Sequence, residues 1–471
     1  MNRRQIWKQY GERGLALPLA LGVMVALSVV GTTLTYYSVA NLHSTSHSGN
    51  GQRAFALAEA GLNNAVSILS KPGNDPTNPS LLPSSGSPAT QTVEGGTVKY
   101  WGSYDSSGGI WTVTGQGTMR NSGGTKPVTR KVSQQYSVTS SPSWKYIYVD
   151  NPGGCLSLTS NVQITQPLFD RGSLCMSSSA AITSGASPVT VAGTIDTSSS
   201  ATVGTSAAHL AVLHVGGGCR FGGSGAYVTP CTATQHVYAD AQDTYIDPTI
   251  RKAPIDTTGW YANAAPGPSH NCTTGSFPGG FDNDSTLNRS LSSVRLLTAS
   301  SYDCTVTDSG QTVGRIAWTP GSPGTLTIQG TIFFDGNLVL DGSAKSVYVG
   351  RAAIYASGTI TFSGSTQFCG KYASGECDWT NWNPDLNMLV LIAGGPTVPD
   401  FQVTSSAMFQ GGIYAATDYT QSSTVKVQGP IQAQNVTLSS SGQSGYPGAT
   451  RVPYGSPGGA IIGQVGGSWS G

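Results

Sequence analysis

The sequence has little charge, and neither sign is concentrated in it. Asp, Glu, Lys and Arg make up 10% of the 471 residues, and the formal net charge is +1. A chain of this kind lacks the basic field that attracts nucleic acid, so its composition gives no specific nucleic-acid signal. Gly is abundant instead, at 62 residues, and is interleaved with Ser, Thr, Val, Ile and Tyr. This bias is typical of a β-rich protein with many turns.

The common catalytic and metal-binding motifs are missing from the sequence. It contains no Gly-x-Ser-x-Gly elbow, no phosphate-binding loop and no Cys-x-x-Cys pair, and its six His are scattered. We therefore expect no catalytic residues, no cofactor and no metal ion. A polysaccharide-active β-helix enzyme stays open as an alternative, because the faces of a β-helix can carry acidic residues. Its candidates by residue type are Asp303, Asp335 and Asp341, although a lone carboxylate at a Gly-bounded corner is normally a turn former.

Cysteine is absent from the first 150 residues and then occurs eight times. An even number of cysteines in an exported chain predicts disulfides. Spacing does not determine which cysteines bond, but we expect neighbours in the sequence to pair. The candidate pairs are Cys155 with Cys175, Cys219 with Cys231, Cys272 with Cys304, and Cys369 with Cys377.

One apolar segment near the N-terminus is long enough to cross a membrane. Four basic residues lie within the first 13 positions, and roughly twenty uncharged residues follow, from Leu15 to about Leu34. At a rise of about 1.5 Å per residue, such a helix spans a hydrocarbon core of about 30 Å. Because basic flanks stay in the cytoplasm, we expect the helix in the inner membrane and the rest of the chain to be exported.

Three kinds of N-terminus share this pattern. A secretory signal would be cut after a site of small residues, for which Ser38-Val39-Ala40 is a candidate. A plain membrane anchor would stay uncut. A prepilin-type leader would be cut after Gly14, so that Leu15 becomes the first residue and the apolar helix stays on the mature chain.

The residues after the apolar segment favour the prepilin-type leader. Between Gln52 and Leu69, apolar residues recur at spacings of three and four, so the helix resumes outside the membrane. The polar segment 43–51 is a poor helix former and could soften this joint. Lys71-Pro72-Gly73 would end the helix.

This N-terminal region resembles that of PilX-type minor pilins of type IV pilus systems. The resemblance covers about the first 70 residues and depends on RGLAL at 13–17, the apolar helix, AF at 54–55 and AEAGL at 58–62. It implies cleavage after Gly14 by a prepilin peptidase, with other pilins and the pilus assembly machinery as partners. It also implies an extracellular filament as the destination. The helix motif of the family falls on Phe55, Glu59 and Gly61, where Glu59 is either an exposed helix carboxylate or a residue with a family-specific packing role.

The sequence departs from most pilins at the fifth residue after the cleavage site. The resemblance implies Glu there, with its charge paired to an amine of the neighbouring subunit, but this chain has Leu19. PilX-type and tip pseudopilins resemble this chain in lacking that Glu, and a subunit at the tip has no neighbour above it to neutralise. The departure fits a tip or initiation position, and it equally fits an anchor that never polymerises. Pro18 lies in the first helical turn, where its missing N–H does no harm.

Three runs with period-two alternation predict a small sheet after the helix. They cover residues 97–101, 110–114 and 128–138, and turn sequences rich in Gly, Ser, Asp and Asn separate them. We expect an antiparallel sheet that covers the apolar stripe of the helix, preceded by an irregular connection over 72–91.

An internal repeat marks the remainder of the chain. Residues 330–343 align with residues 352–365 at an offset of 22, with Ile332 matching Ile354 and Leu338 matching Ile360. Shorter segments similar to this repeat occur over 412–415 and 430–438. Residues 155–215 have a similar pattern of apolar residues, which suggests that they form the first coils. Alternating strands with Gly or Asn corners at about 20 residues per unit are typical of a β-solenoid. A β-sandwich is the alternative, because short strands with turns also describe it.

Two segments interrupt this rhythm. Residues from about 230 to 320 contain Pro, Trp260, Tyr261 and two cysteines, and predict a disulfide-pinned irregular insertion. The cluster Asp282-Asn283-Asp284 could contribute to a calcium site, but a solvated turn suits it better. In the second segment, 369–384, Trp379 and Trp382 would serve a sugar or protein contact if exposed, or plug the core if buried.

We therefore expect a mainly β protein with one long N-terminal α-helix, a small antiparallel pilin-like sheet, and a parallel β-helix (β-solenoid) with a disulfide-pinned insertion. The expected ranges are 1–14 for the leader, 15–70 for the membrane and pilin helix, 71–142 for the sheet and 143–471 for the solenoid. The expected function is that of a minor pilin-like subunit at the filament tip or at initiation, whose solenoid contacts a host surface or a glycan ligand. An uncleaved membrane-anchored surface adhesin is the alternative.

Overall fold

The chain forms two compact units. One contains Met1–Lys71, Pro79–Tyr136 and Gln464–Gly471, and the other contains Pro72–Asn78 and Ser137–Gly463. The computed structural model describes residues 3–71, 76–93, 95–106, 108–121, 126–255, 269–276, 278, 293–308, 311–395, 399–448, 451–459, 461–468 and 470.

The N-terminal helix α1 is continuous from Arg3 to Ser70. The polar segment 43–51 is therefore helical, and no joint interrupts α1 there. Four predicted processing and membrane residues lie on its helical backbone, but their side chains lie outside the described part of the structure: Gly14, Leu15, Pro18 and Leu19.

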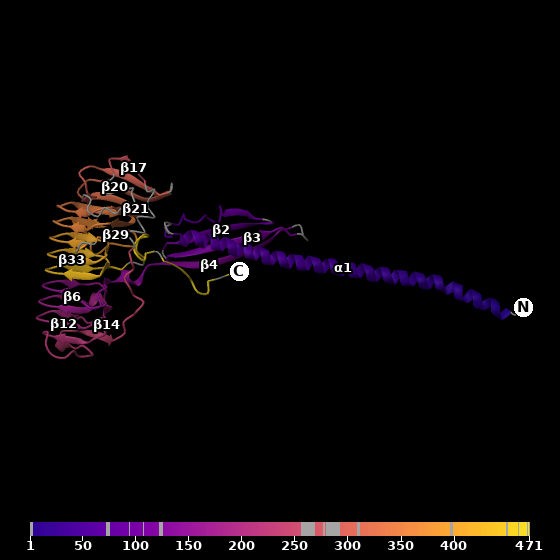
Figure 1. Ribbon diagram of the computed structural model, residues 1–471, viewed down its shortest axis with the longest axis horizontal. Coiled ribbons are helices and arrows are strands. Elements are labelled where there is room, and N and C mark those ends of the chain that lie inside the picture. Colours follow the sequence, from indigo (N-terminus) through magenta and orange to yellow (C-terminus); the bar gives the residue numbers. More distant parts are fainter. Residues whose placement is uncertain are drawn as a thin grey trace. The chain divides into compact units, whose positions relative to one another are not determined.

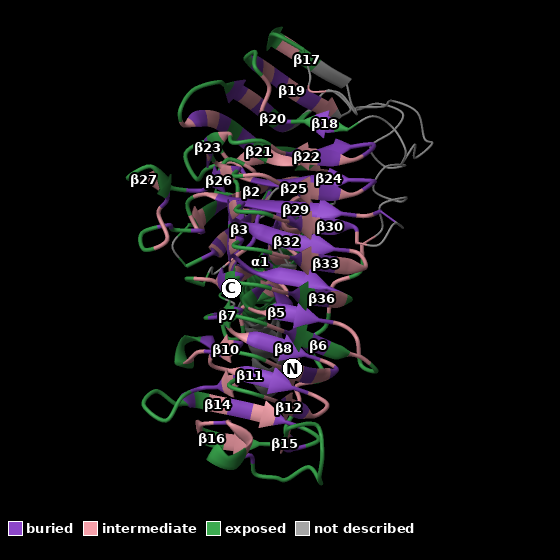
Figure 2. Ribbon diagram, turned by 90° about the vertical axis from the view of Figure 1, so that its left-hand side faces the viewer, coloured by how far each residue is buried: buried purple, intermediate pink, exposed green. Residues whose placement is uncertain are grey.

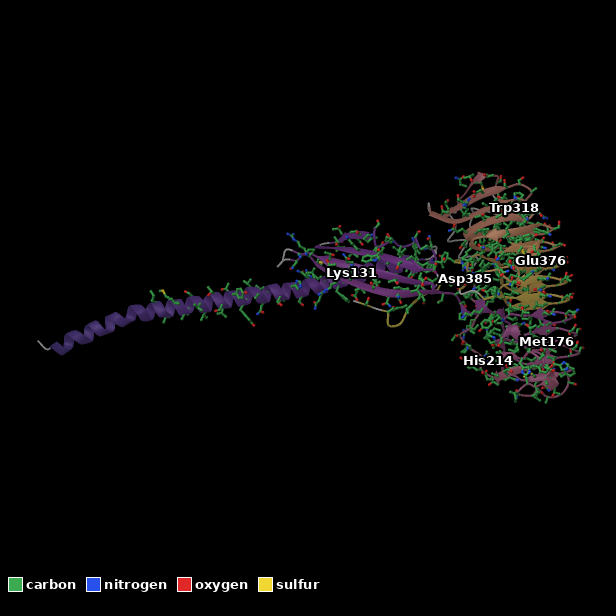
Figure 3. The ribbon with its side chains drawn as sticks, turned by 180° about the vertical axis from the view of Figure 1, so that it is seen from behind. Lys131, Met176, His214, Trp318, Glu376 and Asp385 are labelled. Atoms are coloured by element: carbon green, nitrogen blue, oxygen red, sulfur yellow. A yellow bond between two sulfur atoms is a disulfide. The ribbon has the colours of Figure 1, made fainter. Side chains whose placement is uncertain are left out.

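The outer stretch of α1 presents apolar side chains on all sides. From Leu21 to Leu42 every described side chain is exposed, and Leu34 keeps 62% of its surface accessible. Figure 3 shows these side chains projecting around a lone helix. The most apolar part of this stretch has a mean hydropathy of 1.5 and no buried residue, so α1 is able to cross a membrane by length and composition.

The inner stretch of α1 packs closely on a sheet. Ala54 and Ala58 are fully buried, and they lie against Gly115 and Gly117 of strand β3 (Ile110–Met119). A Cβ atom at Gly117 would lie 2.0 Å from the carbonyl oxygen of Ala54, so only Gly permits this approach. Of the predicted helix motif, Gly61 faces the sheet, Phe55 is half-buried and Glu59 is exposed.

The sheet under the helix has five strands in the order β1-β2-β3-β4-β38. The pairings of β1 with β2 and of β2 with β3 are antiparallel. The predicted runs appear as longer strands, and β1 begins within the last residues of the connection over 72–91 that was expected to be irregular. The other strands are β1 (Ala89–Val93), β2 (Gly96–Asp105), β4 (Val128–Thr139) and β38 (Ile461–Gln464).

The C-terminal residues belong to this sheet, which corrects the expected solenoid boundary at 471. Strand β38 joins the sheet next to β4, and Gln134 donates a hydrogen bond to the hydroxyl of Ser468 over 2.6 Å. Ser133 and Ser470 exchange backbone hydrogen bonds of 2.8 and 2.9 Å. The open edge of β4 takes a partner in this way, because an unpaired strand edge leaves backbone polar groups unsatisfied.

The second unit is a β-solenoid of parallel coils, which confirms the predicted fold class. Its strands form one sheet of 21 strands and one of 10 strands. The repeat at offset 22 pairs in register, since Ile332 lies beside Ile354 and Leu338 beside Ile360. Figure 2 shows the coils as stacked arrows with buried residues along them.

The first half of the solenoid contains short strands and three 3₁₀ helices. Its elements are η1 (Pro142–Lys145), β5 (Ile147–Val149), β6 (Cys155–Leu158), β7 (Gln163–Ile164), β8 (Leu168–Asp170), β9 (Ser173–Met176), β10 (Ala181–Ile182), η2 (Ser184–Ala186), β11 (Val189–Val191), β12 (Ile195–Thr197), β13 (Thr202–Val203), β14 (Leu210–Val215), β15 (Cys219–Phe221), η3 (Ala233–Gln235) and β16 (Ala239–Asp243).

The second half of the solenoid includes longer strands and a small hairpin. Its elements are β17 (Ser269–Thr274), β18 (Val294–Arg295), β19 (Tyr302–Asp308), β20 (Gln311–Thr319), β21 (Gly324–Phe334), β22 (Leu338–Leu340), β23 (Lys345–Val349), β24 (Arg351–Ala356), β25 (Ile360–Phe362), β26 (Gln367–Cys369), β27 (Tyr372–Ala373), β28 (Glu376–Cys377), β29 (Met388–Ala393), β30 (Phe401–Val403), β31 (Met408–Gln410), β32 (Gly412–Ala415), β33 (Asp418–Gln421), β34 (Lys426–Gln428), β35 (Ile431–Ala433), β36 (Asn435–Leu438) and β37 (Gln443–Gly445).

The chain enters the stack in its middle, so the coils of 155–215 do not begin the stack. Strands β5, β6 and β7 pair in parallel with β35, β36 and β37, which lie almost 300 residues later. Figure 1 shows the result, with the late, yellow coils next to the early, magenta ones. We call this contact the junction. It makes one continuous core out of two half-solenoids, each of which would otherwise leave an open end.

The described part of the expected irregular insertion at 230–320 contains strands that belong to the sheets of the solenoid. Strand β16 continues the stack beside β14, and β19, β20 and β21 form an antiparallel extension at the other end of the solenoid, where Trp318 lies (Figure 3). Antiparallel strands there pair the outermost parallel strand and cover the core. Trp260, Tyr261 and the Asp282-Asn283-Asp284 cluster lie outside the described residues.

A strap, residues 244–255, holds the two half-solenoids together. Its Ile250 carbonyl accepts a hydrogen bond from Tyr148 of the first half over 3.3 Å, and its Ala253 carbonyl accepts one from Tyr414 of the second half over 2.5 Å. Lys252 donates to the carbonyl oxygens of Ala415 and Ala416 at 2.6 and 2.8 Å. Burial lowers the pKa of Lys252 to about 8, against the attraction of nearby carboxylates.

Four disulfides occur, between the neighbouring cysteines that the sequence suggested. Each joins elements of the second unit, and the described cysteines are all paired: Cys155–Cys175, Cys219–Cys231, Cys272–Cys304 and Cys369–Cys377.

Candidate contact groove

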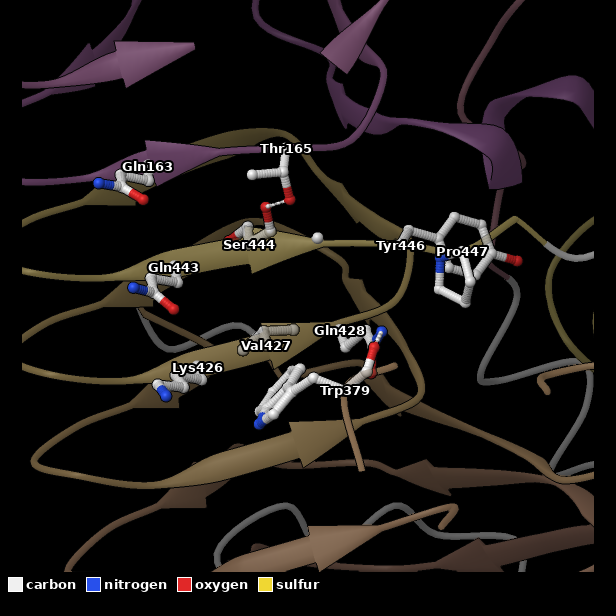
Figure 4. A pocket seen from close by; sticks show the side chains of 11 residues that line it. Gln163, Thr165, Trp379, Lys426, Val427, Gln428, Gln443, Ser444, Tyr446 and Pro447 are labelled. Carbon is white, nitrogen blue, oxygen red and sulfur yellow. Dashed lines mark hydrogen bonds between the residues drawn. The ribbon is translucent and has the colours of Figure 1, made fainter. Parts of the chain in front are cut away.

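A column of polar side chains crosses the junction on one face of the solenoid. Lys426 of β34 pairs with Gln443 of β37, and Gln443 pairs with Gln163 of β7. In-register parallel strands place equivalent side chains on the same side at intervals of about 4.8 Å. Figure 4 shows the three side chains pointing the same way from successive strands.

Each strand reaches this face after a tight corner. Ser423, Ser440 and Ser160 precede the three column residues and have positive φ angles of 70°, 64° and 58°. The left-handed corner turns the chain sharply. The following strand therefore begins at the equivalent position in each coil. The sequence predicted Gly or Asn at such corners, and Ser occupies them here.

A loop over residues 370–384 forms one wall of the groove. The disulfide Cys369–Cys377 closes its first part. The side-chain amide of Gln410 donates to the Asp378 carbonyl over 2.9 Å, and that of Gln428 donates to the Trp379 carbonyl over 2.8 Å. These bonds fix the loop to strands β31 and β34 of the solenoid.

The two tryptophans of this loop have different roles. Trp382 is buried, with 3% of its surface accessible, and its ring N–H donates to the Asn387 carbonyl over 2.9 Å. It is the core plug that the sequence allowed. Trp379 is half-buried, and the Lys426 ammonium lies 6.0 Å from its ring centroid. Trp379 is therefore the tryptophan that remains available for contact.

The groove between the column and the loop has a volume of about 350 Å³. Tyr446 and Pro447 also line it (Figure 4), as does Gly445, which has no side chain. Among the described residues that line it, Lys426 alone is charged, and none is a carboxylate. The lining residues are Gln163, Thr165, Trp379, Lys426, Val427, Gln428, Gln443, Ser444, Gly445, Tyr446 and Pro447.

Residues from both half-solenoids build the groove. Thr165 belongs to the first half, and its backbone N–H and hydroxyl both contact the carbonyl of Ser444, at 2.8 and 3.1 Å. Gln166 donates to the Gly429 carbonyl over 3.1 Å. The groove therefore forms only when the junction is closed.

The three carboxylates proposed for an enzyme have structural partners. Asp303 forms an ion pair with Arg315 at 2.8 Å, which holds the pKa of Asp303 below its usual value. Asp335 is buried and accepts a hydrogen bond of 2.5 Å from Ser357. Asp341 pairs with Arg295. None of the three lines the contact groove.

Within the described residues, no group of three or more His, Cys, Asp or Glu could hold a metal ion. The groove instead offers an aromatic ring, one ammonium group, and amides that both donate and accept hydrogen bonds. Such a set suits recognition of a polar ligand. Sequence reasoning identified Trp379 but missed Lys426, Gln443 and Gln163.

Comparisons with known proteins assign no family. No family model matches the chain, and no curated protein matches it in sequence. Among solved structures, the crystal structure of the competence-associated pilin ComZ from Thermus thermophilus is similar, with 14% sequence identity and a TM-score of 0.38. The match covers 89% of this chain and 97% of that chain. A similarity of this size shows neither the family nor the function of this chain.

Proposed function

We propose that the chain is a minor pilin-like structural subunit, which α1 holds in the inner membrane before assembly and in an extracellular filament afterwards. The observation that carries this proposal is the division of α1 into two stretches. Residues 54–69 pack on the small sheet, whereas residues 21–42 expose apolar side chains all round. An isolated apolar surface of this extent is unfavourable in water, so a bilayer or the helices of other subunits must cover it.

The close helix–sheet packing supports a structural role for the first unit. Gly61, Gly115 and Gly117 allow the helix backbone to approach the sheet, which fixes the inner stretch of α1 as part of a folded domain. The helix therefore joins a folded domain directly to an apolar rod that other helices can bind.

Two features support a tip or initiation position in the filament. Leu19 replaces the Glu whose charge would pair with the subunit above, so a tip or initiation position needs no such partner. The second unit, from Ser137 to Gly463, is much larger than the small sheet, which favours few copies per filament. The contact groove of this unit would then serve surface contact or adhesion. The partners of the whole subunit would be the prepilin peptidase, other pilins and the assembly machinery.

The first residue of the exported protein tests the proposal. Expression in a host with a prepilin peptidase should give Leu15 as the N-terminal residue by Edman degradation or mass spectrometry. A first residue of Asn41 would show a conventional signal peptide, and an intact Met1 would show an uncleaved surface anchor. Either of the last two results contradicts the proposal. A Gly14→Leu variant should block cleavage in the same host.

A non-catalytic role for the solenoid is part of the proposal. The carboxylates of Asp303 and Asp341 are engaged by Arg315 and Arg295, and neither pair offers a free acid and base to a substrate. Incubation with polysaccharides should release no reducing sugar. Release that is lost in an Asp335→Asn or Asp341→Asn variant would instead support the alternative of a β-helix enzyme.

A further inference from the structure

We propose that the contact groove binds an extended saccharide that carries a carboxylate, with Trp379 stacking on a sugar ring and Lys426 pairing with the acid. This inference rests on the proposed role in surface contact and names the class of ligand. Three features of the groove support this proposal: the spacing of the column, the ring of Trp379 in the wall, and the charge of Lys426.

The spacing of the column matches a saccharide chain. Lys426, Gln443 and Gln163 lie on three successive coils, at intervals of about 4.8 Å. This interval is close to the rise of one pyranose unit in an extended glycan. A chain that runs along the solenoid axis would therefore present a similar set of hydroxyl groups to each coil. The two Gln amides both donate and accept hydrogen bonds, as sugar hydroxyl groups require.

The ring of Trp379 supplies the apolar contact. It is half-buried at the edge of the groove, while the hydrogen bond from Gln428 to its backbone carbonyl holds the loop in place. A sugar ring has an apolar face of C–H groups that can lie on an indole ring. A rigid aromatic side chain loses little conformational entropy on binding, so it serves well as an anchor.

The charge of the groove selects an acidic ligand. Lys426 forms no ion pair with the residues that the structure describes, and no carboxylate lines the groove. A ligand carboxylate would be attracted to this ammonium group without competition from a carboxylate among the described lining residues. A nucleic acid would need several cations along its phosphates, and one lysine does not provide them.

A peptide strand suits the groove less well. Strands β34, β37 and β7 each pair with a neighbour on both sides. Their backbone groups are therefore occupied, and a peptide could not extend the sheet. Binding must proceed through side chains, which is the mode that a saccharide uses.

The test is calorimetric titration of the full chain in lipid nanodiscs with hexagalacturonate, and with maltohexaose as a neutral probe of equal length. Hexagalacturonate should bind, and its affinity should fall as salt increases. Lys426→Gln and Trp379→Ala should each weaken binding by about tenfold or more, the loss expected for an anchor residue. Gln443→Ala should weaken it less.

The matched control is the pair formed by Lys131 and Trp101 in the small sheet, where the ammonium lies 5.6 Å from the ring centroid. Lys131→Gln and Trp101→Ala should leave the affinity unchanged. Hydrogen exchange of β34 and β37 would verify that the Trp379→Ala variant keeps the groove folded, and Trp379→Phe should retain most of the affinity.

Three results would overturn the proposal: no binding of hexagalacturonate, equal binding of maltohexaose that is insensitive to Lys426→Gln, or binding of oligodeoxythymidylate in place of the saccharide. Because purified protein is used, these failures are distinct from a failure of the pilin-like role. The latter would appear as a first residue other than Leu15.

Discussion

The hydroxyl of Thr165 donates a hydrogen bond to the carbonyl oxygen of Ser444, 3.1 Å away in space and 279 residues later in the sequence. This contact lies at the junction of the two half-solenoids. There the first coil of the chain pairs with the last coil, in the middle of the stack. The contact groove crosses the same junction. Folding of the solenoid and completion of the groove are therefore linked, because neither half contains the whole column.

A ladder of corner side chains should contribute to closure of the junction. Asn435 accepts a hydrogen bond of 2.5 Å from Asn151 and donates one of 2.7 Å to Asp418. Removing a partly buried hydrogen-bonding group costs about 1–3 kcal/mol. Asn435→Ala should therefore lower the thermal midpoint and increase hydrogen exchange in β5 and β35. Thr437→Ala, an exposed position on the same strand, should change stability by less than about 0.5 kcal/mol. Equal effects of the two substitutions would contradict a specific role for the ladder.

Close packing of α1 on its sheet should not tolerate a side chain at Gly117. A Cβ atom there would lie 2.0 Å from the Ala54 carbonyl oxygen and 2.6 Å from the Ala58 nitrogen, so the helix must move. Overpacking of this kind costs about 1–3 kcal/mol. Gly117→Ala should therefore lower the free energy of unfolding of the first unit in a denaturant titration.

Gly49→Ala is the matched control for this substitution. A Cβ atom at Gly49 meets nothing within 4 Å, and Ala favours a helix by about 1 kcal/mol over Gly. This variant should be as stable as the parent chain or more stable. A Gly117→Ala protein with unchanged stability would show that the helix and strand do not approach as closely as described.

The stability of the solenoid should depend on pH through Asp170. This side chain is fully buried; its Oδ1 accepts a hydrogen bond from the Gly172 N–H over 2.8 Å, and among the described residues its Oδ2 has no partner. Burial raises the pKa of Asp170 from 3.8 to about 7. Between these values the folded state keeps a proton that the unfolded state loses, so the stability from Asp170 is lost as pH rises from about 4 to about 7.

Replacing Asp170 with Asn should remove this dependence. The Asn side chain can still accept from Gly172 but does not ionise. The difference in thermal midpoint between Asp170→Asn and the parent chain should therefore increase in favour of the variant from pH 4 to pH 8. Other carboxylates titrate in both proteins and cancel from the difference. Parallel pH curves for the two proteins would exclude an ionising buried Asp170.

The disulfide Cys369–Cys377 should order the wall of the groove. Both cysteines are buried, and the bond closes the first part of the loop that holds Trp379. A double replacement by Ser should increase hydrogen exchange in residues 370–384. It should leave β11 and β14 of the other half unchanged. The matched control is the double replacement of Cys155 and Cys175, which join β6 to β9 and should leave the loop protected. An unprotected loop in the control would show that its order comes from the whole solenoid.

Much of the fold could be predicted because its signals are local. The offset of 22 residues aligned Ile332 with Ile354, and these residues pair in the structure because equivalent positions of successive coils stack on each other. The alternating runs bounded by turn residues, which are also local signals, predicted β2, β3 and β4. In the core of the solenoid, the buried rings of Phe362 and Phe401 stack with their centroids 6.1 Å apart.

The junction could not be predicted from such signals. The pairing of Gln163 with Gln443 depends on which free coil faces are left to combine, and no repeat offset links those segments. The return of β38 to the small sheet depends on the open edge of β4 in the same way. Ser corners also hid the coil boundaries, since Ser160, Ser423 and Ser440 adopt a left-handed backbone that sequence reasoning assigns to Gly or Asn.

The contact groove was visible in the sequence only through Trp379. Lys426 is a half-buried and Gln443 an exposed polar residue on a short strand, and such residues are common on any surface. One signal was present: each follows a Ser-containing corner by a few residues, at the position that Gln163 holds in its own coil. To recognise the column from the sequence, one would have needed to know how β34, β37 and β7 pair across the junction.

Purification of sheared filaments tests the central claim most directly. Filaments from a strain that expresses the full chain should contain it in small amounts, with Leu15 as its first residue by mass spectrometry. The protein should be absent from filaments when the prepilin peptidase is deleted. A chain that stays in the inner-membrane fraction with Met1 intact, while filaments assemble normally without it, would contradict the account.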